Sequence, residues 1–300
     1  MGAVPKRVGG SGALGRGERL QGWVFDPAAQ VFRLPDWERR GLVVLCSTRL
    51  GGVSRGPYGS MNLSLGVGDD PGRVEENRRR LAGLAGVTAS RVVFAQQVHG
   101  TRVARIGPGD EAAPRGERTL PATDGVLVDR ETSAPVLLFA DCVPVLVHAR
   151  RRPLVGIAHA GWRGAAGGVL LHLLEAARAA GAALDELEVA LGPSIGPECY
   201  PVGEDVVEAF AAAWPWSRRH VRRQGADLRG FLAEQAARAG VEPRDILSDA
   251  PCTACDPRLY SHRRDGPVTG RQGVIVGLAG FASGEGDRAP AVEAVAEEIR

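Results

Sequence analysis

Two strongly apolar segments, residues 143–149 and 153–158, are separated only by the three arginines at 150–152. Short apolar runs joined by a polar turn are typical of two buried antiparallel strands, so we expect a β-hairpin with a basic tip. If the turn is centred on the first two of these arginines, Cys142 and His159 face each other with Cβ atoms about 5 Å apart. A thiolate and an imidazole at this separation can share a metal ion or a proton. A turn of another length changes the register, and a shift by one residue turns one side chain to the other face.

Further short apolar segments alternate with amphipathic ones between residues 21 and 282. The patterns predict strands or strand pairs at residues 23–37, 41–50, 91–107, 124–142, 187–193 and 268–279, and helices at residues 69–87, 165–182, 203–214 and 227–241. Paired strands interleaved with helices indicate an α+β fold with mixed β-sheets, because Rossmann and TIM folds need a regular alternation of strand and helix. No repeat or linker divides this region. We therefore expect a single domain at 21–282, between a disordered tail at 1–20 and a flexible tail at 283–300.

The composition excludes several classes of protein. No apolar run reaches the length of about 18 residues that a membrane span needs, and residues 1–20 lack the pattern of a signal peptide. The net charge of +2 gives no general case for nucleic-acid binding. Five cysteines, an odd number, argue against a disulfide scaffold and favour a reducing, cytoplasmic location.

Lys6, in the N-terminal tail, is the only lysine of the chain. Walker-type phosphate loops, pyridoxal Schiff bases and lysine-dependent aldolases all need a lysine in the folded body. Any phosphate must therefore be held by arginine side chains or by backbone N–H groups.

Two of the six histidines are placed where they can reach a cleft, because each lies at the end of a predicted strand near a glycine. These are His99 in QQVHG and His159 in HAGWRG. With Cys142 they form the usual set of three protein ligands of an open zinc site. The gaps of 43 and 17 residues between them match no compact metal motif, so structural roles stay open. We expect structural or surface roles for three of the other four histidines, His148, His172 and His220.

Two other segments carry polar groups of interest. The sequence PCTAC at 251–255 contains half of the signature of zinc-dependent nucleobase deaminases, but H-x-E or C-x-E, the other half, is absent. We therefore expect structural roles for Cys252 and Cys255. A long loop rich in Gly, Ser and Asn follows residue 47 and contains Arg49. Such a loop can offer donors to an anion, or it can be a plain surface loop.

Several ordered motifs between residues 40 and 280 resemble the laccase-domain family. They include STRLGGVSRGPYGSMNLSLGVGDDP, QQVHG, DGVLVD, ADCVPVL, AHAGWRG, LGPSIGPECYPVG, CTAC and SHRRDGPVTGRQ. Members of this family have been called multicopper polyphenol oxidases and peptidoglycan editing factors, and are described as purine nucleoside phosphorylases with adenosine deaminase activity. The resemblance implies a four-layer α/β/β/α fold and one metal ion, usually zinc, bound by His99, Cys142 and His159.

The resemblance implies a zinc-dependent enzyme that uses phosphate to cleave adenosine, inosine, guanosine and methylthioadenosine, and that deaminates adenosine. For this chemistry we expect Arg49 and Arg163 to contact phosphate or an oxyanion, and Asp141 to act as an acid or base. Asp141 can share a pocket with Cys142 only if the strand bends between them, since neighbours on a regular strand face opposite ways. The oligomeric state is left open.

Three alternatives remain at this point. A copper-dependent polyphenol oxidase is one, although a four-copper laccase needs about ten histidines with H-x-H pairs, and this chain has six histidines and no such pair. A cysteine hydrolase with Cys142 as nucleophile and His159 as base is the second. A binding module that carries metal or nucleoside without turnover is the third.

Overall fold

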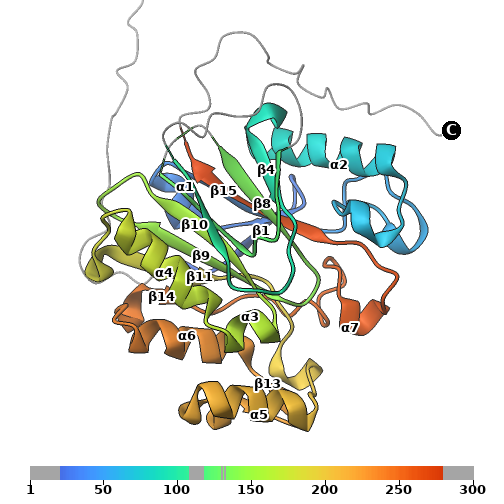
Figure 1. Ribbon diagram of the computed structural model, residues 1–300. Helices are drawn as coiled ribbons and strands as arrows, with labels where there is room; N and C mark the ends of the chain where they lie inside the picture. Colours follow the sequence, from blue (N-terminus) through green and yellow to red (C-terminus); the bar gives the residue numbers. More distant parts are fainter. Residues whose placement is uncertain (1–20, 108–117, 130, 132, 280–300) are drawn as a thin grey trace, which may run out of the picture.

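The computed structural model describes residues 21–107, 118–129, 131 and 133–279 (Figure 1). The predicted tails at 1–20 and 283–300 lie outside these residues. Within them the chain forms two large β-sheets with helices on their outer faces, and a small two-stranded sheet. The predicted combination of helices with mixed β-sheets is confirmed, since both large sheets contain parallel as well as antiparallel pairs.

The strands of the seven-stranded sheet are, in spatial order, β1 (Val24–Asp26), β2 (Val31–Arg33), β3 (Leu42–Ser47), β15 (Gln272–Leu278), β8 (Ala134–Phe139), β4 (Val92–Ala95) and β6 (Arg118–Leu120). Those of the six-stranded sheet are β14 (Ile246–Leu247), β11 (Leu187–Leu191), β9 (Val143–Ala149), β10 (Val155–Ala160), β7 (Gly125–Val128) and β5 (Val103–Ile106). The small sheet pairs β12 (Val221–Arg222) with β13 (Gly225–Ala226). The helices are α1 (Pro35–Arg39), α2 (Pro71–Leu84), α3 (Trp162–Ala166), α4 (Val169–Ala179), α5 (Glu204–Ala213), α6 (Leu228–Arg238) and α7 (His262–Asp265).

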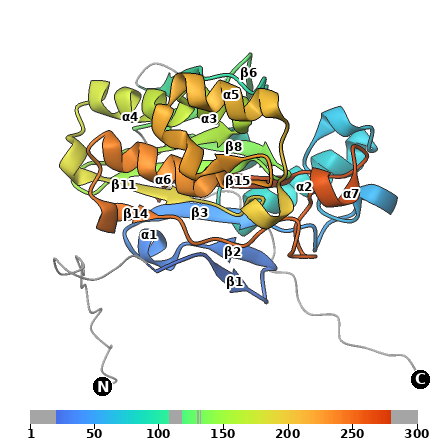
Figure 2. The same cartoon turned by 90° about the horizontal axis from the view of Figure 1, so that it is seen from below.

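Hydrophobic clusters on both faces of each large sheet define how the elements pack. Leu137, Leu146 and Ile157 belong to a cluster between the two sheets. A second cluster joins the seven-stranded sheet to α2, and a third joins the six-stranded sheet to α4, α5 and α6. Figure 1 shows α2 on one side of the paired sheets and α4 and α6 on the other, and Figure 2 shows α5 with this second group. Because strands such as β9 are buried on both faces, they are almost continuously apolar.

Helix α2 illustrates how local signals set the ends of an element. The side chain of Asp70 accepts a hydrogen bond of 2.9 Å from the backbone N–H of Arg73, and Pro71 occupies the first turn. Gly86 follows the helix with a φ of +67°, a left-handed conformation that glycine adopts without strain. The predicted helix at 69–87 is confirmed.

Two predicted strand pairs are wrong in their pairing. The segment 91–107 forms β4 and β5, and 124–142 contains β7 and β8, but the members of each pair belong to different sheets. Both connections cross from one sheet to the other. A local pattern of apolar residues shows that a strand is buried and does not show which sheet it joins. As a result, His99 lies on a crossing between the sheets.

The predicted hairpin of β9 and β10 exists, but its register differs from the expected one. His159 lies opposite Pro144 and not opposite Cys142, because the turn is longer than a turn centred on Arg150 and Arg151. The difference is two residues along the partner strand, so the side-chain face is kept. The basic tip is neutralised, since Nε of Arg151 and Nε of Arg152 each lie 2.8 Å from the buried carboxylate of Glu186.

Candidate metal centre and cavity

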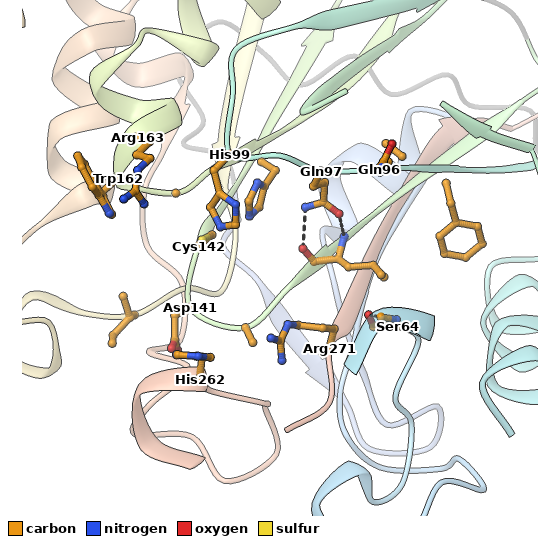
Figure 3. A pocket seen from close by; sticks show the side chains of 18 of the residues that line it. Ser64, Gln96, Gln97, His99, Asp141, Cys142, Trp162, Arg163, His262 and Arg271 are labelled. Atoms are coloured by element: carbon orange, nitrogen blue, oxygen red, sulfur yellow. Dashed lines mark hydrogen bonds between the residues drawn. The ribbon is translucent and has the colours of Figure 1, made fainter. Parts of the chain in front are cut away.

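A cavity of about 920 Å³ opens where the ends of β8, β9 and β10 meet the crossing that carries His99 (Figure 3). Its size lies within the range of pockets that bind small molecules. Trp162 and Arg163 of α3 line it on one side, and Arg271, just before β15, on another. Strands from both sheets and the loops between them therefore build one cavity.

The predicted metal ligands come together at the wall of this cavity. One nitrogen each of His99 and His159 and the sulfur of Cys142 all lie within 4.8 Å of one another; we call these residues the His–Cys–His cluster. His99 has a φ of +59° and Asp141 a φ of +100°, conformations that few non-glycine residues adopt. The chain bends at Asp141, and both Asp141 and Cys142 line the cavity. Such a bend is the condition under which these two neighbours can share a pocket.

The buried carboxylate of Asp124 fixes both histidines of the cluster. Nδ1 of His159 donates to Oδ1 of Asp124 at 3.0 Å, which leaves Nε2 of the ring for the cavity side. The backbone N–H groups of Val98, His99 and Gly100 donate to the same carboxylate at 3.1, 3.0 and 2.8 Å. Such an outer carboxylate is typical of histidines that bind metal.

Charges within the cluster favour an ionised thiol. Burial alone would raise the pKa of Cys142, but the charge of His159 and hydrogen bonds from His159 and His99 outweigh burial and lower it. Burial likewise would lower the pKa of His159, while the charge of Cys142 and the hydrogen bond to Asp124 raise it. A thiolate and two imidazole nitrogens that converge in this way form a ligand set that suits zinc or copper.

Gly161 has no side chain, and the His–Cys–His cluster occupies the space that a side chain at this position would fill. A Cβ atom at this position would lie 2.9 Å from Cδ2 of His99 and 3.0 Å from Sγ of Cys142. Both distances are shorter than or at the limit of contacts that side chains make, so any other residue would displace the two ligands. The glycine of HAGWRG is therefore explained by close approach to the His–Cys–His cluster.

The other predicted site residues have different positions. Arg163 lines the cavity. Asp141 also lines it, and its carboxylate accepts hydrogen bonds from the hydroxyl of Thr253 at 2.6 Å and from the backbone N–H of Arg263 at 2.7 Å. Arg49 is not among the residues that line the cavity: its Nε donates to the carbonyl of Gly59 at 3.0 Å. Its guanidinium also lies 4.9 Å from the Tyr260 ring centroid and 3.6 Å from the carboxylate of Asp265.

Several residues of the site escaped sequence reasoning. Arg271 lines the cavity, and its guanidinium donates to the carbonyls of Thr269 and Gly270 at 2.9 Å. Burial lowers the pKa of Arg271, while the nearby negative charges of Cys142 and Asp141 oppose this. Tyr200 and His262 line the cavity too. In the sequence, the basic segment SHRRDG indicates the region of His262 but not its place in the cavity. For Asp124 the sequence offers only its position directly before an apolar strand.

The histidines that were expected to be structural have partners outside the cavity. Nδ1 of His148 lies 3.1 Å from the carbonyl oxygen of Leu154, and Nδ1 of His172 lies 2.9 Å from that of Thr101. His220 contacts the carboxylate of Glu234 at 2.7 Å.

Comparison with known proteins gives a consistent result. A family described as "Multi-copper polyphenol oxidoreductase laccase" matches residues 43–279. "Purine nucleoside phosphorylase YlmD" of Geobacillus stearothermophilus is 37% identical over 247 residues, which cover 79% of this chain and 90% of the relative. "Purine nucleoside phosphorylase YfiH" of Escherichia coli is 35% identical over 251 residues, covering 82% and 98%. The crystal structure of hypothetical protein YfiH from Bacillus licheniformis superposes with a TM-score of 0.78 at 31% identity, covering 85% of this chain and 98% of that chain.

Proposed function

The chain belongs to the family of multi-copper polyphenol oxidoreductase laccases, and we propose that it is a zinc-dependent purine nucleoside phosphorylase that also deaminates adenosine. The observation that carries the proposal is the His–Cys–His cluster at the wall of a cavity large enough for a nucleoside and phosphate. We propose adenosine, inosine, guanosine and methylthioadenosine as substrates, and residues 21–282 as the catalytic domain.

Zinc is the metal that best fits the cluster. His99, Cys142 and His159 would hold the ion through two imidazole nitrogens and one thiolate, and three protein ligands are the number typical of catalytic zinc sites. Copper is the alternative metal. When bound, zinc acts as a Lewis acid and lowers the pKa of a water molecule to about 7. The part of Asp124 is to hold the imidazole of His159 in the tautomer that turns Nε2 toward the metal.

Phosphorolysis needs an anion next to the anomeric carbon of the nucleoside. Arg163 and Arg271 are our candidates, because both line the cavity and neither forms an ion pair with a carboxylate within the part of the chain that the structure describes. Their positive charges would hold phosphate while the bond between sugar and base breaks, and would stabilise its charge in the transition state. Arg49, which contacts Asp265, is a weaker candidate than Arg271.

Proton transfer is assigned to Asp141. Its carboxylate lines the cavity beside Cys142, and two short hydrogen bonds hold it in one orientation. In phosphorolysis the departing purine needs a proton, and in deamination a proton must pass from water to the leaving ammonia. A carboxylate fixed at the cavity wall could take a proton from dihydrogen phosphate or from water and pass it to the departing purine or to the leaving ammonia.

The alternatives are less well supported. The relatives are named as phosphorylases, which favours neither a polyphenol oxidase nor a cysteine hydrolase. Within the described residues no helix combines the length and apolar character that crossing a membrane requires. All five cysteines are unpaired, in agreement with our proposal of a reducing, cytoplasmic location.

One experiment tests the proposed function. Protein purified with zinc is incubated with a panel of purine nucleosides, with and without inorganic phosphate, and the free base, sugar 1-phosphate and ammonia are quantified. We expect base release that requires phosphate, ammonia release from adenosine that does not, and loss of both activities in His99→Ala. Full turnover after complete metal removal, or a covalent adduct on Cys142, would instead identify a cysteine hydrolase. Absence of turnover across the panel would leave a binding module.

A further inference from the structure

Three cysteines outside the cavity form a second cluster. The ligand atoms of Cys199, Cys252 and Cys255 all lie within 4.8 Å of one another, and Sγ of Cys199 is 3.5 Å from Sγ of Cys255. We call them the cysteine cluster. Cys199 comes from the loop after β11, and the other two come from the loop after β14. None of the three lines the cavity, so the cluster is separate from the His–Cys–His cluster.

We propose that the cysteine cluster is a second, structural zinc site. Zinc binds thiolates at about 2.3 Å in a tetrahedron, which sets neighbouring sulfur atoms about 3.8 Å apart. The sulfurs of Cys199 and Cys255 are already near this separation. Soft thiolate ligands select zinc or monovalent copper over harder ions, and zinc needs no change of oxidation state.

The backbone around Cys252 has the form that structural zinc sites use. Cys252 and Cys255 are spaced C-x-x-C, and the N–H groups of Cys255 and Asp256 both donate to the carbonyl of Cys252, at 3.2 and 2.9 Å, which closes a tight turn. The N–H of Gly196 donates to Sγ of Cys252 at 3.1 Å. Hydrogen bonds to a ligand sulfur orient it and stabilise its anionic form.

Three sulfur atoms that converge within 4.8 Å of one another repel each other when they are ionised. A divalent ion bound between them would remove this repulsion and permit all three sulfurs to ionise. The Glu198 carboxylate is not among the ligand atoms that lie within 4.8 Å of one another, so the fourth position would be taken by water or by this carboxylate after a change of side-chain rotamer.

The position of the cluster suggests what this ion does. Cys199 directly precedes Tyr200, which lines the cavity. Cys252 directly precedes Thr253, whose hydroxyl donates to Asp141 at 2.6 Å. A zinc ion would therefore join the loop that carries Tyr200 to the loop that holds Asp141, and would fix two walls of the cavity without contacting substrate.

The test measures how many zinc ions the full chain binds. The protein is loaded with zinc under reducing conditions, excess metal is removed, and the bound zinc is quantified by elemental mass spectrometry. We expect two zinc ions per wild-type chain, one in Cys255→Ser, one in His99→Ala and none in the double variant. Cys46→Ala is the matched control, because Cys46 is buried and belongs to neither cluster, and it should keep two. Cobalt loading gives a second readout: the sulfur-to-cobalt absorption of the wild type should fall in Cys255→Ser.

Cys255 is exposed, so serine should be tolerated there; Cys199→Ser provides a second variant should it fold poorly. One zinc ion in both the wild type and Cys255→Ser overturns the proposal. The proposal is also overturned if Cys199 and Cys255 form a disulfide in the native protein and the reduced protein binds no second zinc ion. Because the readout is metal content, the result does not depend on the proposed nucleoside chemistry.

Discussion

Nδ1 of His159 donates a hydrogen bond of 3.0 Å to Asp124, and that same carboxylate accepts the backbone N–H of His99. One buried side chain thus orients the ring of one proposed ligand and the main chain of the other. We therefore propose that Asp124 positions the ligands of the proposed metal ion, although it does not lie among the residues that line the cavity.

Asp124→Asn should lower zinc affinity and turnover by about 10- to 100-fold, the range typical of outer partners of metal-binding histidines. An amide can accept with one oxygen only, so it cannot serve the imidazole and three N–H groups together. Zinc affinity from competition with a chelator is the measurement. Asp129→Asn is the control. Asp129 follows the other end of β7 and forms an ion pair with the exposed Arg105. Equal zinc affinity in the two variants would refute this role.

Gly161→Ala should reduce zinc content and abolish turnover, because the added methyl group would collide with Cδ2 of His99 and Sγ of Cys142. Gly83→Ala is the matched control: a Cβ there meets nothing within 4 Å, and alanine favours the helix α2. Circular dichroism should show both variants folded. Retention of a full zinc complement by Gly161→Ala would contradict the placement of the ligands.

Arg271→Ala and Arg163→Ala should each damage phosphorolysis more than deamination, because water replaces phosphate in the second reaction. Loss of a charge-assisted contact costs about 1.5 to 3 kcal/mol, which corresponds to about 10- to 150-fold in rate. Arg49→Ala should affect both reactions alike, since its guanidinium contacts Gly59, Asp265 and Tyr260 outside the cavity. Both rates are measured on adenosine. A selective loss of phosphorolysis in Arg49→Ala alone would move the phosphate site to that loop.

His220 should make stability depend on pH. The carboxylate of Asp227, 3.9 Å from Nδ1, raises the pKa of His220 in the folded state above the usual value of 6.5, against burial, and Glu234, 2.7 Å from Nε2, adds to the increase. Because its pKa is higher in the folded state, protonated His220 stabilises the fold, and this contribution is fully present below about pH 6.5. It is lost as the pH rises through the folded-state pKa. The difference in Tm between wild type and His220→Gln should therefore be largest near pH 6 and shrink toward pH 9. His172→Gln, at a histidine that contacts a carbonyl, should show no such trend; a difference for His220→Gln that grows with pH would contradict the assignment.

The amino-acid pattern identifies the proposed ligands better than their supports. His99 and His159 are identifiable because each follows an apolar segment and lies near a glycine, and Cys142 because a hairpin returns to it. The predicted register is wrong because the turn is longer than expected, and the arginines of this turn contact Glu186, a residue distant in sequence. Arg271 and Cys199 were missed for a related reason: their neighbours come from distant segments that only the tertiary fold brings together.

The crossings between the sheets have a consequence for how the chain reaches its native state. At β4–β5, β7–β8 and β8–β9 the chain leaves one sheet for the other, so neither sheet can be completed without the other. Most of the contacts that build the fold therefore join residues distant in sequence, a topology that slows folding. His99, Asp141 and Cys142 lie on these crossings, so the proposed site cannot be assembled by a partly folded chain and forms only together with both sheets.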